Sequence, residues 1–171
     1  QEISADTLQD VDVCIDFTTP SGVIGNIDLV SSAGKNIVVG TTGWLNDLSN
    51  IENMIRLKKT GLIYSSNFSI GMNLFFLLAE KASSLIGPAG IYDVFGYELH
   101  HKKKVDSPSG TAKDLAEIVR ENFPNKKSVV YDKLDRKIEE SEFHFASVRG
   151  GSIPGTHVIG FDSAFDTIEL K

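Results

Sequence analysis

The residues best suited to chemistry lie together in one run, 97–112. This run holds two adjacent histidines, His100 and His101, then three consecutive lysines, then the turn Pro-Ser-Gly-Thr at 108–111. Histidine is the side chain that exchanges protons near neutral pH. The lysines add fixed positive charge in a chain whose net charge is −6. The run therefore predicts proton transfer on a small molecule that carries carboxylates.

The turn at 108–111 opens a helical pattern over 111–123, and this start suits a bound anion. Ser109 is a good N-cap residue. Gly110 and Thr111 would offer backbone N–H groups at the positive end of the helix dipole. An ammonium group such as that of Lys104 would add a charge-assisted hydrogen bond. We predict a carboxylate site at this helix end.

The stretch 92–101 reads as a strand that leads into the histidines. Alternation along a strand puts Glu98 and His100 on one face and Leu99 and His101 on the other. Glu98 is then close enough to bias the pKa of His100. Judged alone, the paired histidines fit a polar strand edge equally well, and the lysines fit a solvated surface.

The histidines do not predict a metal site. The four candidates are His100, His101, His144 and His157. Adjacent histidines on a strand point to opposite faces, and the sequence has neither a cysteine cluster nor a His-x-x-x-His spacing. Its single cysteine, Cys14, excludes an internal disulfide framework and reads as a buried strand residue.

Composition narrows the class of protein. The chain has 171 residues and an ordinary globular balance, with 41% hydrophobic and 23% charged residues. A pI near 5.2 argues against a nucleic-acid partner. The start lacks an apolar signal region, and the most apolar stretch, 72–79, is too short to cross a bilayer. We expect a cytoplasmic protein without a membrane partner, and, since the chain starts without Met, an internal piece of a longer one.

Strands and helices alternate in the first part of the chain. Strands are expected over 11–17, 37–39 and 62–64, the first of them buried, with helices over 20–33 and 46–58. Short connections between such elements are typical of a parallel α/β sheet. Ligands bind such sheets at the carboxyl ends of the strands, where the loops 18–20, 40–43 and 65–68 fall.

The pattern changes after about residue 68. A helix over 72–86 is apolar on most sides and is expected to be largely buried. Strands follow over 129–131, 142–149, 157–162 and 167–170, and a hairpin-like turn at 150–155 joins the second and third of these. The predicted fold class is α/β: a partial Rossmann-type parallel sheet domain over 1–68, the C-terminal half of a dinucleotide-binding domain, then an α+β domain with a mixed or antiparallel sheet over 69–171.

The segment 98–112 resembles the signature of the 4-hydroxy-tetrahydrodipicolinate (dihydrodipicolinate) reductase family. That signature is Glu-x-His-His-x-x-Lys-x-Asp-x-Pro-Ser-Gly-Thr-Ala, and every fixed position matches. Stretches 15–20, 40–43 and 67–71 agree in order and spacing. The later Arg-Gly-Gly at 149–151 and Gly-Thr-His at 155–157 resemble the family's sheet hairpin. The resemblance covers essentially the whole chain.

The resemblance implies an oxidoreductase that reduces a cyclic dicarboxylate imine with NADPH or NADH, in the diaminopimelate route to lysine. It implies a homotetramer assembled through the sheets of the second domain. It makes His100 the general acid/base and Lys104 a proton donor. The implied substrate-binding residues are His101, Ser109, Gly110 and Thr111. The implied cofactor-binding residues are Gly40, Thr41, Thr42, Ser65, Ser66, Asn67 and Phe68.

One family feature does not occur in this sequence. Members of the family begin with a strand and a Gly-x-x-Gly-x-x-Gly loop that binds the pyrophosphate of the cofactor. The residue that determines the preference for NADH or NADPH lies in the same part of the family's sequence. We therefore expect the whole protein to be an active reductase and this piece to be inactive or nearly so. Two alternatives stay open: a noncatalytic carboxylate-binding or assembly module, and a different Rossmann-type oxidoreductase acting on an acidic substrate.

Overall fold

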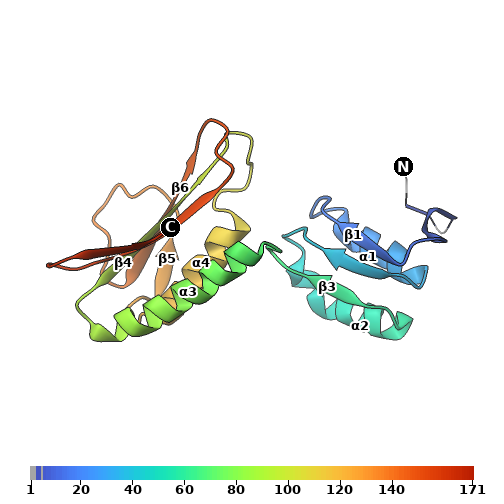
Figure 1. Ribbon diagram of the computed structural model, residues 1–171, viewed down its shortest axis with the longest axis horizontal. Helices are drawn as coiled ribbons and strands as arrows, with labels where there is room; N and C mark the ends of the chain where they lie inside the picture. The colour runs from blue at the N-terminus through green and yellow to red at the C-terminus, as the bar shows by residue number, and fades with distance from the viewer. Residues whose placement is uncertain (1–2, 5) are drawn as a thin grey trace. The chain divides into compact units, whose positions relative to one another are not determined.

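The computed structural model describes residues 3–4 and 6–171 (Figure 1). The chain divides into two compact units, Gln1–Phe68 and Ser69–Lys171. Unit 1 holds a three-stranded sheet in the order β1-β2-β3, and unit 2 holds a five-stranded sheet in the order β5-β6-β4-β7-β8. The two sheets are separate, so each unit is described by itself.

Unit 1 is a parallel α/β sheet, as its sequence pattern predicts. Both strand pairs, β1 with β2 and β2 with β3, run parallel. The helices between them end near glycine or a left-handed residue, as at Gly34 with a φ of 72°. Its elements are η1 (Asp6–Leu8), β1 (Val13–Asp16), α1 (Val23–Ser32), β2 (Asn36–Val39), η2 (Leu45–Asp47), α2 (Leu48–Lys58) and β3 (Leu62–Tyr64).

The core of unit 1 lies on one face of its sheet. Residues of α1 and α2 share a single buried cluster with β2 and Trp44. On the other face Ile15 is 68% exposed and Ile63 is 62% exposed. The expectation that the first strand is buried is therefore wrong for its outward residues, because both helices contribute to one core. Cys14 is half-buried beside that core, and burial raises the pKa of its thiol.

Unit 2 is a mixed sheet with β4 at its centre. Strand β4 runs parallel to β6 and antiparallel to β7, which confirms a mixed sheet. Apolar residues of α3 and α4 pack with four buried phenylalanines in one core cluster. The elements are α3 (Ile70–Ile86), η3 (Gly87–Ala89), β4 (Asp93–His100), α4 (Gly110–Glu121), β5 (Ser128–Val130), β6 (Glu142–Arg149), β7 (Thr156–Asp162) and β8 (Thr167–Leu170).

The segment 150–155 does not form the predicted hairpin. Strands β6 and β7 lie on opposite sides of β4 instead of pairing with each other. The segment crosses the carboxyl end of β4, where Gly150 N donates to His100 O at 2.9 Å and Lys102 N donates to Gly151 O at 3.3 Å. Turn residues between two strands fit a hairpin and a crossing loop alike, so the sequence pattern did not separate them.

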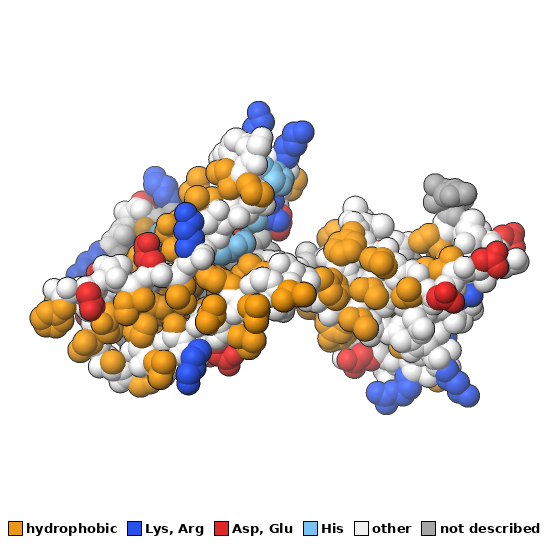
Figure 2. Space-filling view, viewed as in Figure 1, with side chains coloured by type: hydrophobic (Ala, Val, Ile, Leu, Met, Phe, Trp, Pro, Cys, Tyr) orange, Lys and Arg blue, Asp and Glu red, His pale blue; other side chains and the backbone are white. Residues whose placement is uncertain are grey.

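Helix α3 is less buried than its composition suggests. Ala79 and Ser83 are buried, whereas Leu77 and Leu78 are each 60% exposed. Figure 2 shows hydrophobic side chains gathered along this helix. The stretch Ile70–Ala89 is long and apolar enough to cross a membrane by length and composition, which the shorter stretch 72–79 did not suggest. Only 17% of this stretch is buried, and its inner residue Ala79 belongs to the core cluster of unit 2.

Candidate functional site

The carboxylate of Glu98 lies at the centre of the polar cluster in unit 2. Glu98 is fully buried in the middle of β4. Its Oε1 accepts hydrogen bonds from Ser109 N at 3.0 Å, Ser147 Oγ at 2.9 Å and Arg149 Nη2 at 2.8 Å. Its Oε2 accepts from Ser109 Oγ. One side chain thus ties β4 to β6 and to the start of α4.

This carboxylate is held in its charged form. Burial acts to raise the pKa of Glu98, but the neighbouring His157 ring and the hydrogen bonds from Ser109 and Arg149 outweigh burial and lower the pKa well below its usual range. A fixed negative charge therefore sits inside the unit. It is balanced by the Arg149 guanidinium, whose side chain is 17% exposed.

Two imidazole rings face the same oxygen of Glu98. His100 Nε2 lies 3.2 Å from Glu98 Oε2, and His157 Nε2 lies 3.4 Å from it. Burial lowers the pKa of His100; the positive charges of His157, Lys104 and Arg149 lower it further, and Glu98 opposes them. Glu98 and His100 share a buried face of β4, which confirms the predicted alternation.

The same three side chains have the donor types of a metal site. The ligand atoms of Glu98, His100 and His157 lie within 4.8 Å of one another. The sequence predicted no metal here because the spacing of its histidines matches no metal-binding pattern. The Arg149 guanidinium, 2.8 Å from the same carboxylate, already supplies the positive charge that a cation would bring. We therefore assign no metal to this cluster.

The N-terminus of α4 lies beside this cluster. Ser109 is the N-cap, as predicted, and its Oγ accepts a hydrogen bond from Ala112 N at 3.0 Å. Gly110 begins the helix and Thr111 follows it. Because the Ser109 hydroxyl donates to Glu98 and caps the helix, its hydrogen-bonding capacity is used within the protein. Gly110 and Thr111 supply the first backbone N–H groups of the helix.

Lys104 and His101 lie in the loop between β4 and α4. Lys104 Nζ forms an ion pair with Asp106 Oδ1 at 2.9 Å, and its side chain is 25% exposed. The backbone N–H of Lys104 donates to His101 O at 3.1 Å. His101 Nδ1 is buried and has no hydrogen-bond partner among the residues that the structure describes. Both side chains thus lie within a few residues of the helix end that could hold an anion.

Gly155 bounds the ring of His100 from the loop that crosses β4. Its φ of 147° favours glycine. A Cβ atom at this position would lie 3.1 Å from His100 Cε1 and 3.4 Å from His100 Nδ1. Any side chain at this position would therefore press on the edge of the His100 ring that carries Nδ1.

Sequence reasoning missed the roles of Ser147, Arg149, His157 and Gly155. Register brings them together, because Glu98 lies opposite Ser147 on one neighbouring strand and opposite His157 on the other. The motifs Arg-Gly-Gly and Gly-Thr-His were visible in the sequence. What they did not reveal is that β4 lies between the two strands that carry them.

In unit 1 the carboxylate of Asp16 organises the loops at the carboxyl ends of β1 and β2. Asp16 is buried and accepts hydrogen bonds from Thr41 Oγ1 at 2.7 Å, Asn26 Nδ2 at 2.7 Å and Thr18 N at 3.0 Å. Burial acts to raise its pKa, but these hydrogen bonds outweigh burial and lower the pKa. The loops after two strands are thereby fixed to each other.

The predicted cofactor residues lie at the carboxyl ends of β2 and β3. Gly40 approaches the Phe17 ring so closely that a Cβ atom would lie 2.0 Å from it. Thr42 and Ser66 are exposed. Ser65 Oγ donates to Asn67 O at 2.8 Å and accepts from Asn67 N at 3.2 Å. Phe68 is 43% exposed. Internal contacts therefore fix the shape of these two loops, while Thr42 and Ser66 stay exposed.

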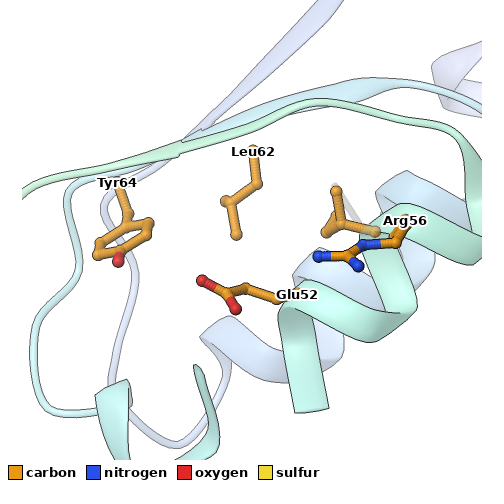
Figure 3. A pocket seen from close by; sticks show the side chains of 5 residues that line it. Glu52, Arg56, Leu62 and Tyr64 are labelled. Carbon is orange, nitrogen blue, oxygen red and sulfur yellow. The ribbon is translucent and has the colours of Figure 1, made fainter. Parts of the chain in front are cut away.

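A pocket of about 340 Å³ lies elsewhere in unit 1, between α2 and β3 (Figure 3). Its lining residues are Glu52, Ile55, Arg56, Leu62 and Tyr64. None of the predicted site residues is among them. The pocket therefore takes no part in the site described above.

The chain matches two family models along almost its whole length. Residues 2–68 match the model described as dihydrodipicolinate reductase, N-terminus, and residues 71–171 match the model described as dihydrodipicolinate reductase, C-terminus.

Curated relatives carry the same name. The chain is 36% identical over 161 residues to 4-hydroxy-tetrahydrodipicolinate reductase from Christiangramia forsetii, covering 94% of this chain and 66% of the relative. It is 38% identical over 167 residues to the reductase from Buchnera aphidicola subsp. Schizaphis graminum, covering 94% of this chain and 60% of the relative. The chain thus spans less than two thirds of these relatives.

Solved structures agree on the fold. A dipicolinate-bound dihydrodipicolinate reductase from Paenisporosarcina sp. TG-14 is 27% identical with a TM-score of 0.68, over 98% of this chain and 65% of that one. A putative myo-inositol dehydrogenase from Sinorhizobium meliloti 1021, at 13% identity and a TM-score of 0.52, covers 98% of this chain and 60% of that one and shares the fold alone. With two matching models that together cover residues 2–68 and 71–171, the chain belongs to the dihydrodipicolinate reductase family.

Proposed function

We propose that the whole protein reduces 4-hydroxy-tetrahydrodipicolinate to tetrahydrodipicolinate with NADPH or NADH, in the diaminopimelate route to lysine. Family membership supports the reaction class. The observation that carries the proposal for this chain is the buried Glu98 carboxylate, which binds the helix cap Ser109 and faces His100. It fixes a proton donor beside an anion-binding helix end.

The substrate's carboxylates fit the charges of unit 2. One carboxylate would accept hydrogen bonds from the backbone N–H groups of Gly110 and Thr111, at the positive end of α4. The Lys104 ammonium would pair with it in place of Asp106, which Lys104 now binds at 2.9 Å. His101 supplies a further ring nitrogen nearby. That a related reductase binds dipicolinate, a pyridine dicarboxylate, supports this assignment.

His100 is the proposed proton donor. Its Nε2 faces Glu98, which stabilises the protonated ring and leaves Nδ1 as the atom that gives a proton to the substrate. Gly155 lies beside Nδ1 without a side chain that would press on the ring. The cofactor, when bound, would supply the hydride, and the 4-hydroxyl group of the substrate would leave as water, so that hydride and proton together give tetrahydrodipicolinate. The protein's own contribution is to hold the acid, to neutralise the ring carboxylates and to keep Glu98 ionised.

The cofactor contacts are proposed at the ends of β2 and β3. The loop of Gly40, Thr41 and Thr42 and the loop of residues 65–68 follow parallel strands, where α/β sheets bind nucleotides. Support comes from the Asp16 network that fixes Thr41 and from the exposure of Thr42 and Ser66 in the same two loops.

We further propose that copies of the chain associate through the outer face of the unit 2 sheet, as in a homotetramer, in the cytoplasm. The helices of unit 2 share their core with the inner face. On the outer face β4 and β6 align Tyr97 with Ala146, and Leu99 with Val148, which is 50% exposed. A half-exposed apolar sheet face is a typical interface. Val148→Glu should produce monomers in light scattering, whereas Val105→Glu, at a residue 97% exposed outside the sheet, should not.

The test of the reaction is substrate-dependent oxidation of NADPH and NADH by the full-length protein. His100→Gln should lower kcat by about 100-fold or more, because a positioned general acid contributes at least that much. His144→Gln, in the same sheet, is the matched control. Wild-type kcat in His100→Gln, or no turnover by the unmodified full-length protein, would refute the proposal.

A further inference from the structure

His157 holds a position in the site that no part of the proposed reaction uses. The register of β4 and β7 sets it opposite Glu98, on the buried face that also carries His100. The two rings meet edge to face, with centroids 5.3 Å apart and planes at 74°. Their Nε2 atoms lie 3.4 Å and 3.2 Å from one oxygen, Glu98 Oε2.

Glu98 Oε2 is approached by a third donor as well. It also accepts the hydroxyl of Ser109. Both Nε2 atoms are buried, and neither has an aligned hydrogen bond within the described part of the chain. An acceptor shared by three donors cannot offer each of them its best geometry. His100 therefore does not have sole use of the carboxylate that stabilises its protonated form.

We propose that His157 is a positioning residue for the acid: by sharing Glu98 Oε2 with His100, it weakens the hold of Glu98 on the proton of His100 and makes His100 a stronger acid. This rests on the proposed function only for its effect on turnover. The sharing itself is a property of the folded chain.

The charges that face His100 come from every side of it. Glu98 lies on its own strand, Lys104 in the following loop, Arg149 on β6 and His157 on β7. Burial and the last three lower the pKa of His100, whereas Glu98 raises it. Lysine and arginine stay charged throughout the neutral range, but a histidine can change charge between about pH 5 and 8.

The first experiment follows the ring signals of the histidines by NMR during a pH titration of the 171-residue chain. If the rings share a proton acceptor, His100 and His157 titrate as a coupled pair, with curves that depart from single-site form. His157→Gln replaces the charged ring by a neutral, weaker donor to Glu98 Oε2 and should therefore move the His100 midpoint to higher pH. His144→Gln, on the other face of the sheet, should leave that midpoint unchanged.

The second experiment measures the pH dependence of kcat in the full-length enzyme. A weaker acid transfers its proton more slowly but keeps it to higher pH. His157→Gln should therefore lower the low-pH plateau of kcat by about 3- to 10-fold, move its alkaline fall to higher pH, and leave KM within about twofold. A purely structural role of His157 would lower kcat at every pH without moving the profile.

Single-site titrations of His100 and His157 in the unsubstituted chain would overturn the proposal, whether or not His157→Gln folds. So would an unmoved His100 midpoint or an unmoved kcat profile in that variant. Coupled titrations in a full-length protein without reductase activity would leave the sharing intact and refute the proposed reaction instead.

Discussion

Replacing Glu98 by Gln should destabilise unit 2 strongly. Glutamine has nearly the same shape, but its amide NH2 would face donors, since both carboxylate oxygens of Glu98 accept hydrogen bonds. The change also leaves the Arg149 guanidinium without its charge partner. Removing one member of a buried ion pair costs about 3–5 kcal/mol. Because Arg149 keeps 17% exposure, we expect the lower end, about 3 kcal/mol, or roughly a 150-fold change in the unfolding constant.

The stability that the chain loses in Glu98→Gln should depend on pH in a defined direction. The pKa of Glu98 is lowered in the folded chain, so the unfolded chain takes up a proton first as the pH falls. The stabilisation by Glu98 is therefore complete above its unfolded-state pKa and declines as the pH drops below it. The glutamine variant does not titrate at this position. The difference between the two proteins should be greatest near neutral pH and should shrink below about pH 4.

The assay is amide hydrogen exchange of peptides from β4 and β6, with urea unfolding followed by circular dichroism. Trp44, the single tryptophan, lies in unit 1, so its fluorescence follows the other unit in the same samples. The control is Glu117→Gln, which breaks the exposed pair of Glu117 with Arg120 and should cost less than about 1 kcal/mol. Equal effects of the two substitutions, or a Glu98→Gln cost that does not change with pH, would refute the reasoning.

Three further predictions concern single contacts. Gly155→Ala should lower kcat by at least about tenfold with the fold retained, because its Cβ would press on the His100 ring at a φ that favours glycine; unchanged kinetics would contradict this. Lys104→Ala should weaken dipicolinate binding by about 10- to 30-fold in calorimetry. This is near the low end of the affinity losses seen when one partner of a charge pair is removed, because Lys104 is partly exposed. An equal effect of Lys103→Ala would show that only net charge matters. Thr41→Ala should destabilise unit 1 by about 1–2 kcal/mol, because Asp16 loses a hydrogen bond; an unshifted Trp44 unfolding curve would count against that network.

Most elements of this fold could be predicted from the sequence because local signals define them. The apolar spacing of α1, α2 and α4 predicts those helices to within a few residues, and Ser109 caps α4 as expected. Burial was harder to predict. An apolar helix such as α3 and an apolar strand such as β1 look fully buried in sequence, although each packs a single face.

The motif of the proposed active site could be recognised in the sequence, but the residues that hold it in place could not. His100 and Glu98 are two residues apart, so alternation alone put them on one face. Arg149 and His157 are about fifty residues away along the chain, and they reach Glu98 only because β4 runs between β6 and β7. Strand order follows from long-range packing, and the turn residues at 150–155 fit a hairpin equally well.

The central claim is that a ring dicarboxylate binds where the end of β4 meets the start of α4. The most direct test is a backbone amide NMR titration of the chain with dipicolinate. We predict the largest shifts at Gly110 and Thr111, with smaller ones at His100 and Lys104, and the need for about 10- to 30-fold more dipicolinate to reach them in Lys104→Ala. Saturable binding with shifts confined to other segments, or no binding by a folded chain, would contradict the account.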